Sequence, residues 1–204
     1  MNGSSEVSVE KFDKGWFFDG AGEEKALIFY PGAKVATEAY APLMYQLTES
    51  GIDCFLVDMP FHMAFFGMNR AEEIMQEYNY EAWYLGGHSL GGAMAANFAA
   101  DYVEDHTDGI RGLLLLAAYP TKDLSTSDMS VVTVYGSEDG VLNMDKIVAG
   151  RELMPQDYKE VCIEGGNHAQ FGSYGTQKGD GTAAIPAEEQ WARTVEVFVG
   201  DESE

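Results

Sequence analysis

The chain alternates short apolar runs with longer segments whose apolar residues recur at helical spacing. The runs predict β-strands at residues 15–18, 26–30, 54–57, 82–86, 112–117, 131–135 and 158–163. Residues 113–116 and 131–134 are apolar without alternation, which is typical of strands buried on both faces. Between and after the strands, helices are predicted at residues 38–50, 71–78, 90–106, 144–153 and 187–198. The pattern predicts an α/β fold in which helices cover both faces of a mostly parallel central sheet.

The ends of some elements carry their own signals. The first predicted helix ends at Ser50-Gly51, a common stop signal. Strand 15–18 is followed by the turn-rich residues 19–22, which predict an antiparallel edge hairpin leading into the parallel region. No repeat, low-complexity segment or linker divides the chain, so we expect residues 1–204 to form a single domain with residues 1–25 as its N-terminal edge-strand region.

The charge balance narrows the classes of partner. The 204 residues are 46% hydrophobic, enough for a sizeable core, and 12 Lys+Arg against 34 Asp+Glu give a net charge of −22. An acidic surface of this kind repels phosphate backbones and anionic lipid, so we expect no nucleic-acid and no membrane partner. No apolar stretch approaches the roughly 18 residues needed to cross a bilayer. Residues 1–10 show no signal peptide, and we expect a cytoplasmic protein, although a leader missing from this sequence stays possible.

The cysteines and histidines argue against a metal. Cys54 and Cys162 both lie in strand-like runs, which predicts two buried, reduced thiols rather than a disulfide. Neither a CxxC nor an HExxH spacing occurs, so nothing indicates a zinc site. A nucleotide-binding α/β domain would need a GxGxxG or Walker phosphate loop, and the chain contains neither.

The sharpest chemical signal is the pentapeptide Gly87-His88-Ser89-Leu90-Gly91, which follows a predicted strand and opens a predicted helix. A serine on so sharp a strand-to-helix turn needs neighbours without side chains, which explains the glycines two residues to each side. The turn exposes the hydroxyl at the carboxyl end of the sheet. A helix-capping serine in a glycine-rich turn is the structural alternative. The strand before it and the helix after it favour a nucleophile.

A serine nucleophile needs a base, and the chain has four histidines. His168 follows the last predicted strand on a glycine-rich loop, at the same sheet edge as the serine, and is the favoured base. His62, in the apolar loop after strand 54–57, is the second choice. We expect the His88 side chain to point away from the serine and His106 to interact with a helix dipole.

The base needs a carboxylate to hold its tautomer. Strand 131–135 ends in a tight turn that carries Glu138 and Asp139; Asp139 is favoured and Glu138 is the alternative. An Asp-Gly pair is also simply common in turns. The oxyanion of an acyl-transfer intermediate needs N–H donors, which we expect from the backbones of Leu90 and Ala33.

Four motifs resemble the α/β-hydrolase superfamily, and within it a compact bacterial group described as alpha/beta hydrolase fold-5. They are residues 29–35 (FYPGAKV), 86–92 (GGHSLGG), 135–140 (YGSEDG) and 166–172 (GNHAQFG). Pro31 stands where relatives more often carry a histidine. The resemblance implies an α/β-hydrolase fold without metal or cofactor, with Ser89 as nucleophile, His168 as base and Asp139 as acid. It identifies no substrate.

Two loops bear on specificity. Residues 59–68 are rich in Met and Phe, so Phe61, Met63 and Phe65 are candidates for an acyl or aryl pocket, with ordinary packing as an equal alternative. The loop after His168, including residues 179–181, either shapes specificity or only routes the chain into the last helix. Residues 118–131 leave no room for a large lid domain, which favours an open site and small substrates.

The sequence therefore predicts a serine hydrolase that cleaves small carboxylic esters through an acyl-enzyme intermediate, with a small-molecule acyl substrate as its partner. A peptidase, thioesterase or acyltransferase would use the same residues. A protein that binds a small ligand without turning it over is the alternative from another class. The oligomeric state stays open.

Overall fold

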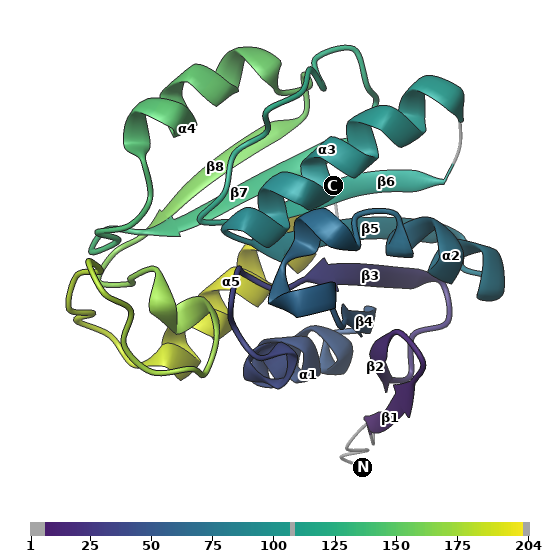
Figure 1. Ribbon diagram of the computed structural model, residues 1–204, viewed down its shortest axis with the longest axis horizontal. Coiled ribbons are helices and arrows are strands. Elements are labelled where there is room, and N and C mark those ends of the chain that lie inside the picture. Colours follow the sequence, from purple (N-terminus) through teal and green to yellow (C-terminus); the bar gives the residue numbers. More distant parts are fainter. Residues whose placement is uncertain (1–6, 107–108, 202–204) are drawn as a thin grey trace.

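The computed structural model describes residues 7–106 and 109–201, which are built around one eight-stranded sheet (Figure 1). The strand order is β1-β2-β4-β3-β5-β6-β7-β8, with β1 and β2 antiparallel and the strands from β4 to β8 parallel. The predicted fold class is confirmed. The strands are β1 (Ser8–Phe12), β2 (Gly15–Asp19), β3 (Lys25–Tyr30), β4 (Asp53–Val57), β5 (Ala82–His88), β6 (Ile110–Leu116), β7 (Ser130–Gly136) and β8 (Tyr158–Ile163).

Helices cover both faces of the sheet, as Figure 1 shows with α1 and α5 below it and α3 and α4 above it. The five helices lie where the periodicity predicts them: α1 (Ala41–Glu49), α2 (Arg70–Glu77), α3 (Leu90–Asp105), α4 (Met144–Gly150) and α5 (Ala187–Asp201). Short 3-10 turns lie beside them: η1 (Thr37–Tyr40), η2 (Pro60–His62), η3 (Ala64–Phe66), η4 (Arg151–Leu153) and η5 (Ala169–Phe171).

The central parallel strands have no polar face because each face packs into its own core. Along β3, Ile28 and Tyr30 join the core on the side of α2 and α3, while Leu27 and Phe29 join the core on the side of α1 and α5. All four side chains are completely buried. Apolar runs without alternation are the expected result for strands buried twice.

The predicted edge hairpin is wrong in its pairing. Strand β2 pairs with the preceding β1, an exposed and charged strand that the apolar pattern does not reveal, and on its other side with β4. It cannot pair with β3, because both edges of β3 are already used by β4 and β5. Residues 19–22 instead bridge from β2 to β3, and the Gly20 N–H donates to Asp53 Oδ1 at 2.9 Å.

The prediction of two buried thiols holds for only one cysteine. Cys54 is completely buried within β4, whereas Cys162 is exposed. The difference follows from position, because β8 is the last strand of the sheet and lacks a neighbour on one side.

The segment between β6 and β7, residues 117–129, contains neither helix nor strand, so no lid domain is inserted there. Within residues 7–106 and 109–201, no helix has both the length and the apolar character needed to span a bilayer.

Candidate active site

Ser89 occupies the sharp turn between β5 and α3 with φ 54° and ψ −121°, backbone angles that residues with a side chain rarely adopt. Its N–H donates to the Leu116 carbonyl at 2.9 Å, which ties the turn to the neighbouring strand β6. Its side chain makes no capping hydrogen bond to α3. The structural alternative of a capping serine therefore does not describe this residue.

The glycines around Ser89 are required by close backbone approaches. A Cβ added to Gly91 would lie 2.1 Å from the Tyr30 carbonyl oxygen, and one added to Gly87 would lie 2.6 Å from the carbonyl carbon of Gly91. A Cβ on Gly92 would lie 2.6 Å from Cβ of Ala118. The turn thus packs directly against the backbone at the end of β3 and against the residues that follow β6.

We expect Gly91→Ala to lower the free energy of unfolding by about 2–3 kcal/mol, because the added methyl group would collide with the backbone at the end of β3 and neither segment can move away. The matched control is Gly200→Ala near the end of α5, where an added Cβ meets nothing within 4 Å. Alanine should be neutral there or stabilise by up to about 1 kcal/mol. Urea unfolding of both variants measures the difference, and equal stabilities would contradict the packing described here.

The structure brings Asp139 and His168 together at the carboxyl ends of β7 and β8. Oδ2 of Asp139 lies 2.8 Å from Nδ1 of His168, and each side chain is only 2% exposed. The other oxygen, Oδ1, accepts the N–H groups of Val141 at 2.9 Å and Leu142 at 2.7 Å, which fixes the carboxylate in its turn. A carboxylate can only accept, so the neutral imidazole carries its proton on Nδ1 and presents a lone pair on Nε2.

Nε2 of His168 is buried and has no hydrogen-bond partner among the described residues. His168 and Ser89 line the same cavity. A buried base with one fixed nitrogen and one unused nitrogen, beside a strained serine, is the arrangement that can take a proton from a hydroxyl.

The alternative candidates lie elsewhere. Glu138 is exposed, and its carboxylate is within 3.4 Å of the Ser137 hydroxyl rather than beside the imidazole. His62 is exposed and does not line the cavity. His106 is exposed at the end of α3, where it stacks on Tyr102 with ring centroids 4.2 Å apart.

His88 is a buried side chain that packs against the candidate base. Its Nδ1 lies 2.7 Å from the Tyr40 hydroxyl, which also accepts the Gly32 N–H at 3.1 Å. Burial raises the pKa of Tyr40 and lowers that of His88 well below its usual value, so the hydroxyl keeps its proton and the imidazole is neutral. The His88 ring packs on His168 with centroids 4.5 Å apart. A neutral ring in this position adds no positive charge beside the candidate base.

The two expected oxyanion donors have unused N–H groups. Neither the Leu90 N–H nor the Ala33 N–H donates to any acceptor within the described chain. Leu90 lines the cavity beside Ser89, whereas Ala33 does not. The loop that carries Ala33 follows β3, and its residue Pro31 passes directly against the first turn of α3 at Gly91. Gly32 leaves room for the Tyr40–His88 pair, because a Cβ there would lie 2.8 Å from the hydroxyl.

The cavity at Ser89 has a volume of about 270 Å³ and a mostly apolar lining without a charged carboxylate or ammonium group. Sequence reasoning missed most of its wall, because the wall comes from the loops that follow β6 and β7. Both loops follow the carboxyl ends of parallel strands, as the serine turn does, and this was the available signal. The lining residues are Ser89, Leu90, Ala93, Ala117, Ala118, Tyr119, Val141, Leu142, Asn143 and His168.

The predicted pocket residues Phe61, Met63 and Phe65 do not line this cavity. Phe61 and Phe65 are 83% and 67% exposed and pack edge to face against Phe66. They lie on the strained loop after β4, which is joined to the loop of Ala33 by a 2.8 Å hydrogen bond from the Lys34 N–H to the His62 carbonyl.

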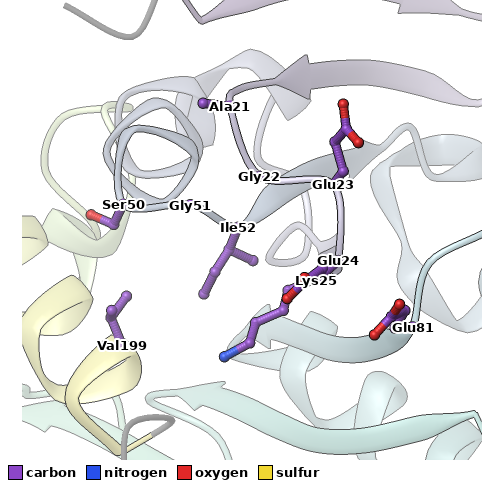
Figure 2. A pocket seen from close by; sticks show the side chains of 10 residues that line it. All are labelled: Ala21, Gly22, Glu23, Glu24, Lys25, Ser50, Gly51, Ile52, Glu81 and Val199. Carbon is purple, nitrogen blue, oxygen red and sulfur yellow. The ribbon is translucent and has the colours of Figure 1, made fainter. Parts of the chain in front are cut away.

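A larger cavity of about 590 Å³ lies at the amino ends of the parallel strands (Figure 2). It is bordered by Glu23, Glu24, Lys25 and Glu81 at the amino ends of β3 and β5. Ligands of open α/β sheets bind outside the carboxyl ends of the strands. We therefore assign the candidate site to the smaller cavity. In the described part of the chain, no three His, Cys, Asp or Glu side chains are grouped so that they could hold a metal ion.

Comparison with known proteins places these features in context. A family model described as "Alpha/beta hydrolase family" matches residues 26–192. The fold is similar to that of a putative hydrolase from Agrobacterium vitis (TM-score 0.69, 13% identity, 96% of this chain and 99% of that chain). It is also similar to that of Est1E from Butyrivibrio proteoclasticus (TM-score 0.65, 15% identity, 98% of this chain and 100% of that chain). A monoacylglycerol lipase from Paleococcus ferrophilus has a similar fold as well (TM-score 0.66, 15% identity, 96% of this chain and 99% of that chain). A comparison of this sequence with curated proteins found no match.

Proposed function

The chain belongs to the alpha/beta hydrolase family, and we propose that within it this protein is a serine hydrolase that cleaves small, neutral carboxylic esters. The observation that carries the proposal is the 2.8 Å contact between Asp139 and a buried His168 whose Nε2 is unused and which shares a cavity with the strained Ser89. The unused Nε2 does not distinguish His168 by itself, because Nε2 of the buried His88 also has no partner among the described residues. His168 differs from His88 in its contact with a carboxylate and in lining the cavity of Ser89.

In the first half-reaction, Nε2 of His168 accepts the proton of the Ser89 hydroxyl as Oγ attacks the ester carbonyl. The resulting oxyanion is stabilised by the N–H groups of Leu90 and Ala33. His168 is then an imidazolium held by the Asp139 carboxylate, and it returns its proton to the departing alkoxide. The products of this half are a free alcohol and an acyl group on Ser89.

In the second half-reaction, water takes the place of the alcohol. His168 accepts a proton from water, and the hydroxide attacks the acyl carbonyl to form a second oxyanion at the same N–H groups. Collapse of this intermediate breaks the bond to Ser89, whose Oγ recovers the proton. The carboxylic acid leaves, and both side chains are back in their starting protonation states.

The cavity limits the substrate. Its volume of about 270 Å³ is slightly below the range of about 300–1,000 Å³ that is usual for small-molecule sites, so we expect it to hold a short acyl group. Its lining carries no charged carboxylate or ammonium to pair with an ionic substrate, and the net charge of −22 disfavours the approach of anions. The structural neighbours include a monoacylglycerol lipase and a carboxyl esterase, which supports a carboxylic-ester substrate.

We expect p-nitrophenyl esters with about two to four acyl carbons to be hydrolysed with the highest kcat/KM, because acyl groups of this size match the small volume of the cavity. Longer acyl chains should lose activity steadily, because they must leave the cavity. The measurement is release of p-nitrophenolate over a series of rising acyl length. A preference for long chains would contradict the size argument.

Reaction with a fluorophosphonate separates hydrolysis from ligand binding. The probe needs an activated serine, so labelling is expected for the folded protein and not for the urea-unfolded chain. A folded protein that neither reacts nor turns over any ester would favour a non-catalytic ligand-binding role. Labelling without ester turnover would favour a peptidase, thioesterase or acyltransferase.

A further inference from the structure

Asp180 lies in the long loop between η5 and α5, and its carboxylate accepts four backbone N–H groups. Oδ1 accepts from Gly140 at 3.1 Å, from His168 at 3.2 Å and from Gly181 at 2.9 Å. Oδ2 accepts from Ala169 at 2.8 Å. Gly140 directly follows Asp139, so one side chain joins the loop of the acid to the loop of the base.

The backbones of these loops interlock at glycines. A Cβ on Gly140 would lie 2.5 Å from the Gly179 carbonyl oxygen, and one on Gly181 would lie 2.0 Å from the Glu138 carbonyl oxygen. A Cβ on Gly136 would lie 2.2 Å from the Gly166 carbonyl oxygen. Figure 1 shows the yellow-green segment that leads into α5 beside the ends of β7 and β8.

Gln190 of α5 also holds the base loop in place. Oε1 of the completely buried Gln190 accepts the Asn167 N–H at 3.0 Å, and its Nε2 donates to the Asn167 carbonyl at 2.8 Å. The Asn167 amide in turn donates to the Gly181 carbonyl at 2.8 Å. These contacts fix the base loop to α5. Within the described residues, only the Asp180 side chain binds both that loop and the residue after Asp139.

We propose that Asp180 is a positioning residue, a second carboxylate that sets the distance between Asp139 and His168 without touching substrate. This inference rests on the proposed function, since it concerns the geometry of the same site. The residues that form the 2.8 Å contact come from loops after different strands. The Glu138 N–H donates to the Gly166 carbonyl at 2.8 Å and the Gly165 N–H donates to the Ser137 hydroxyl at 2.8 Å, but both bonds lie before Asp139 and His168 in the two loops. Asp180 binds the N–H of His168 itself and that of the residue after Asp139, so it acts closest to the contact. Small misplacements of catalytic groups reduce rate far more than they reduce substrate binding.

The test compares Asp180→Asn with wild type in ester hydrolysis. The amide keeps one acceptor oxygen but turns an NH₂ group toward N–H donors, so the clamp is broken on one side. We expect kcat to fall about 10- to 100-fold while KM stays within about twofold. The matched control is Asp123→Asn, which removes another backbone-binding carboxylate, one that accepts the Ser125 N–H at 2.9 Å in the segment between β6 and β7. The control should retain wild-type kcat.

An unchanged kcat in Asp180→Asn would overturn the proposal, and so would a loss expressed mainly in KM, which would make Asp180 a substrate-binding residue. If the variant does not fold, amide hydrogen exchange in the wild-type protein decides instead. The N–H groups of Gly140, His168 and Ala169 should then exchange slowly and open together, because they share one acceptor side chain. Independent, fast exchange would overturn the proposal. The exchange result does not depend on turnover, so it remains informative even if wild type hydrolyses no ester.

Discussion

Replacing Ser89 by alanine is expected to reduce ester turnover by at least about 10⁴-fold and to abolish labelling by a fluorophosphonate. The mechanism needs Oγ as the attacking atom, and no other hydroxyl side chain of the described chain lines the cavity except that of Tyr119, whose phenol is a much weaker nucleophile for acyl transfer. Thermal unfolding should be nearly unchanged, because the side chain makes no capping hydrogen bond. The measurements are p-nitrophenyl ester hydrolysis, gel-based labelling and a melting curve on the same preparation.

The variant also separates this site from any other on the molecule. Ser50, directly after α1, is a suitable control because its hydroxyl donates to the Gln46 carbonyl at 2.9 Å and lies outside the cavity. Ser50→Ala should keep full labelling. Activity that persists in Ser89→Ala at the wild-type level would rule out the acyl-enzyme mechanism given above.

Replacing Asp139 by asparagine is expected to lower kcat by about 10⁴-fold with little change in fold. The N–H groups of Val141 and Leu142 hold one oxygen in place, so the asparagine must keep its carbonyl oxygen there and turn its NH₂ toward His168. Nδ1 then becomes an acceptor, and the imidazole proton moves to Nε2. A protonated Nε2 cannot take the proton from Ser89, so the loss falls on the chemical step.

The neighbouring residue supplies the control for this prediction. Glu138→Gln changes an equal charge at an exposed position and should leave kcat within about twofold of wild type, as surface substitutions usually have small effects. Nitrogen-15 NMR of the imidazoles would report the tautomer directly. If Asp139→Asn retained most of its activity with Nδ1 still protonated, the assignment of Asp139 as the orienting carboxylate would be wrong.

The predictable part of the structure is the part encoded by neighbours in sequence. The turn at Ser89 requires glycines two residues away on each side, and the strand and helix around it follow from continuous apolar and helix-period segments. The same holds for the order of strands along the chain and for α3, whose predicted end differs from the observed one by a single residue. Each of these features rests on local backbone geometry or on burial, and both leave a pattern in the sequence.

The remainder depends on pairings between distant segments. Strand β2 pairs with β4 because β4 and β5 already occupy both edges of β3, and this is a property of the whole sheet. The contact of Asp180 with Gly140 and His168 joins positions 40 and 12 residues apart, and an aspartate between two glycines looks in the sequence like an ordinary turn. The exposed position of Phe61 likewise depends on what packs nearby rather than on its own apolar character.

The location of the proposed nucleophile and of its proposed partners in the sheet implies two separate routes to losing the proposed activity. Ser89 follows a central strand that is enclosed by neighbours on both sides, whereas Asp139 and His168 follow the last two strands at the periphery. Mutations that loosen the periphery would disable the proposed proton transfer and would also displace the part of the cavity wall formed by Val141, Leu142 and Asn143, while the serine turn persists. A descendant of this protein could therefore keep the glycine-flanked serine after losing the proposed activity, and the first changes would be found around β7 and β8.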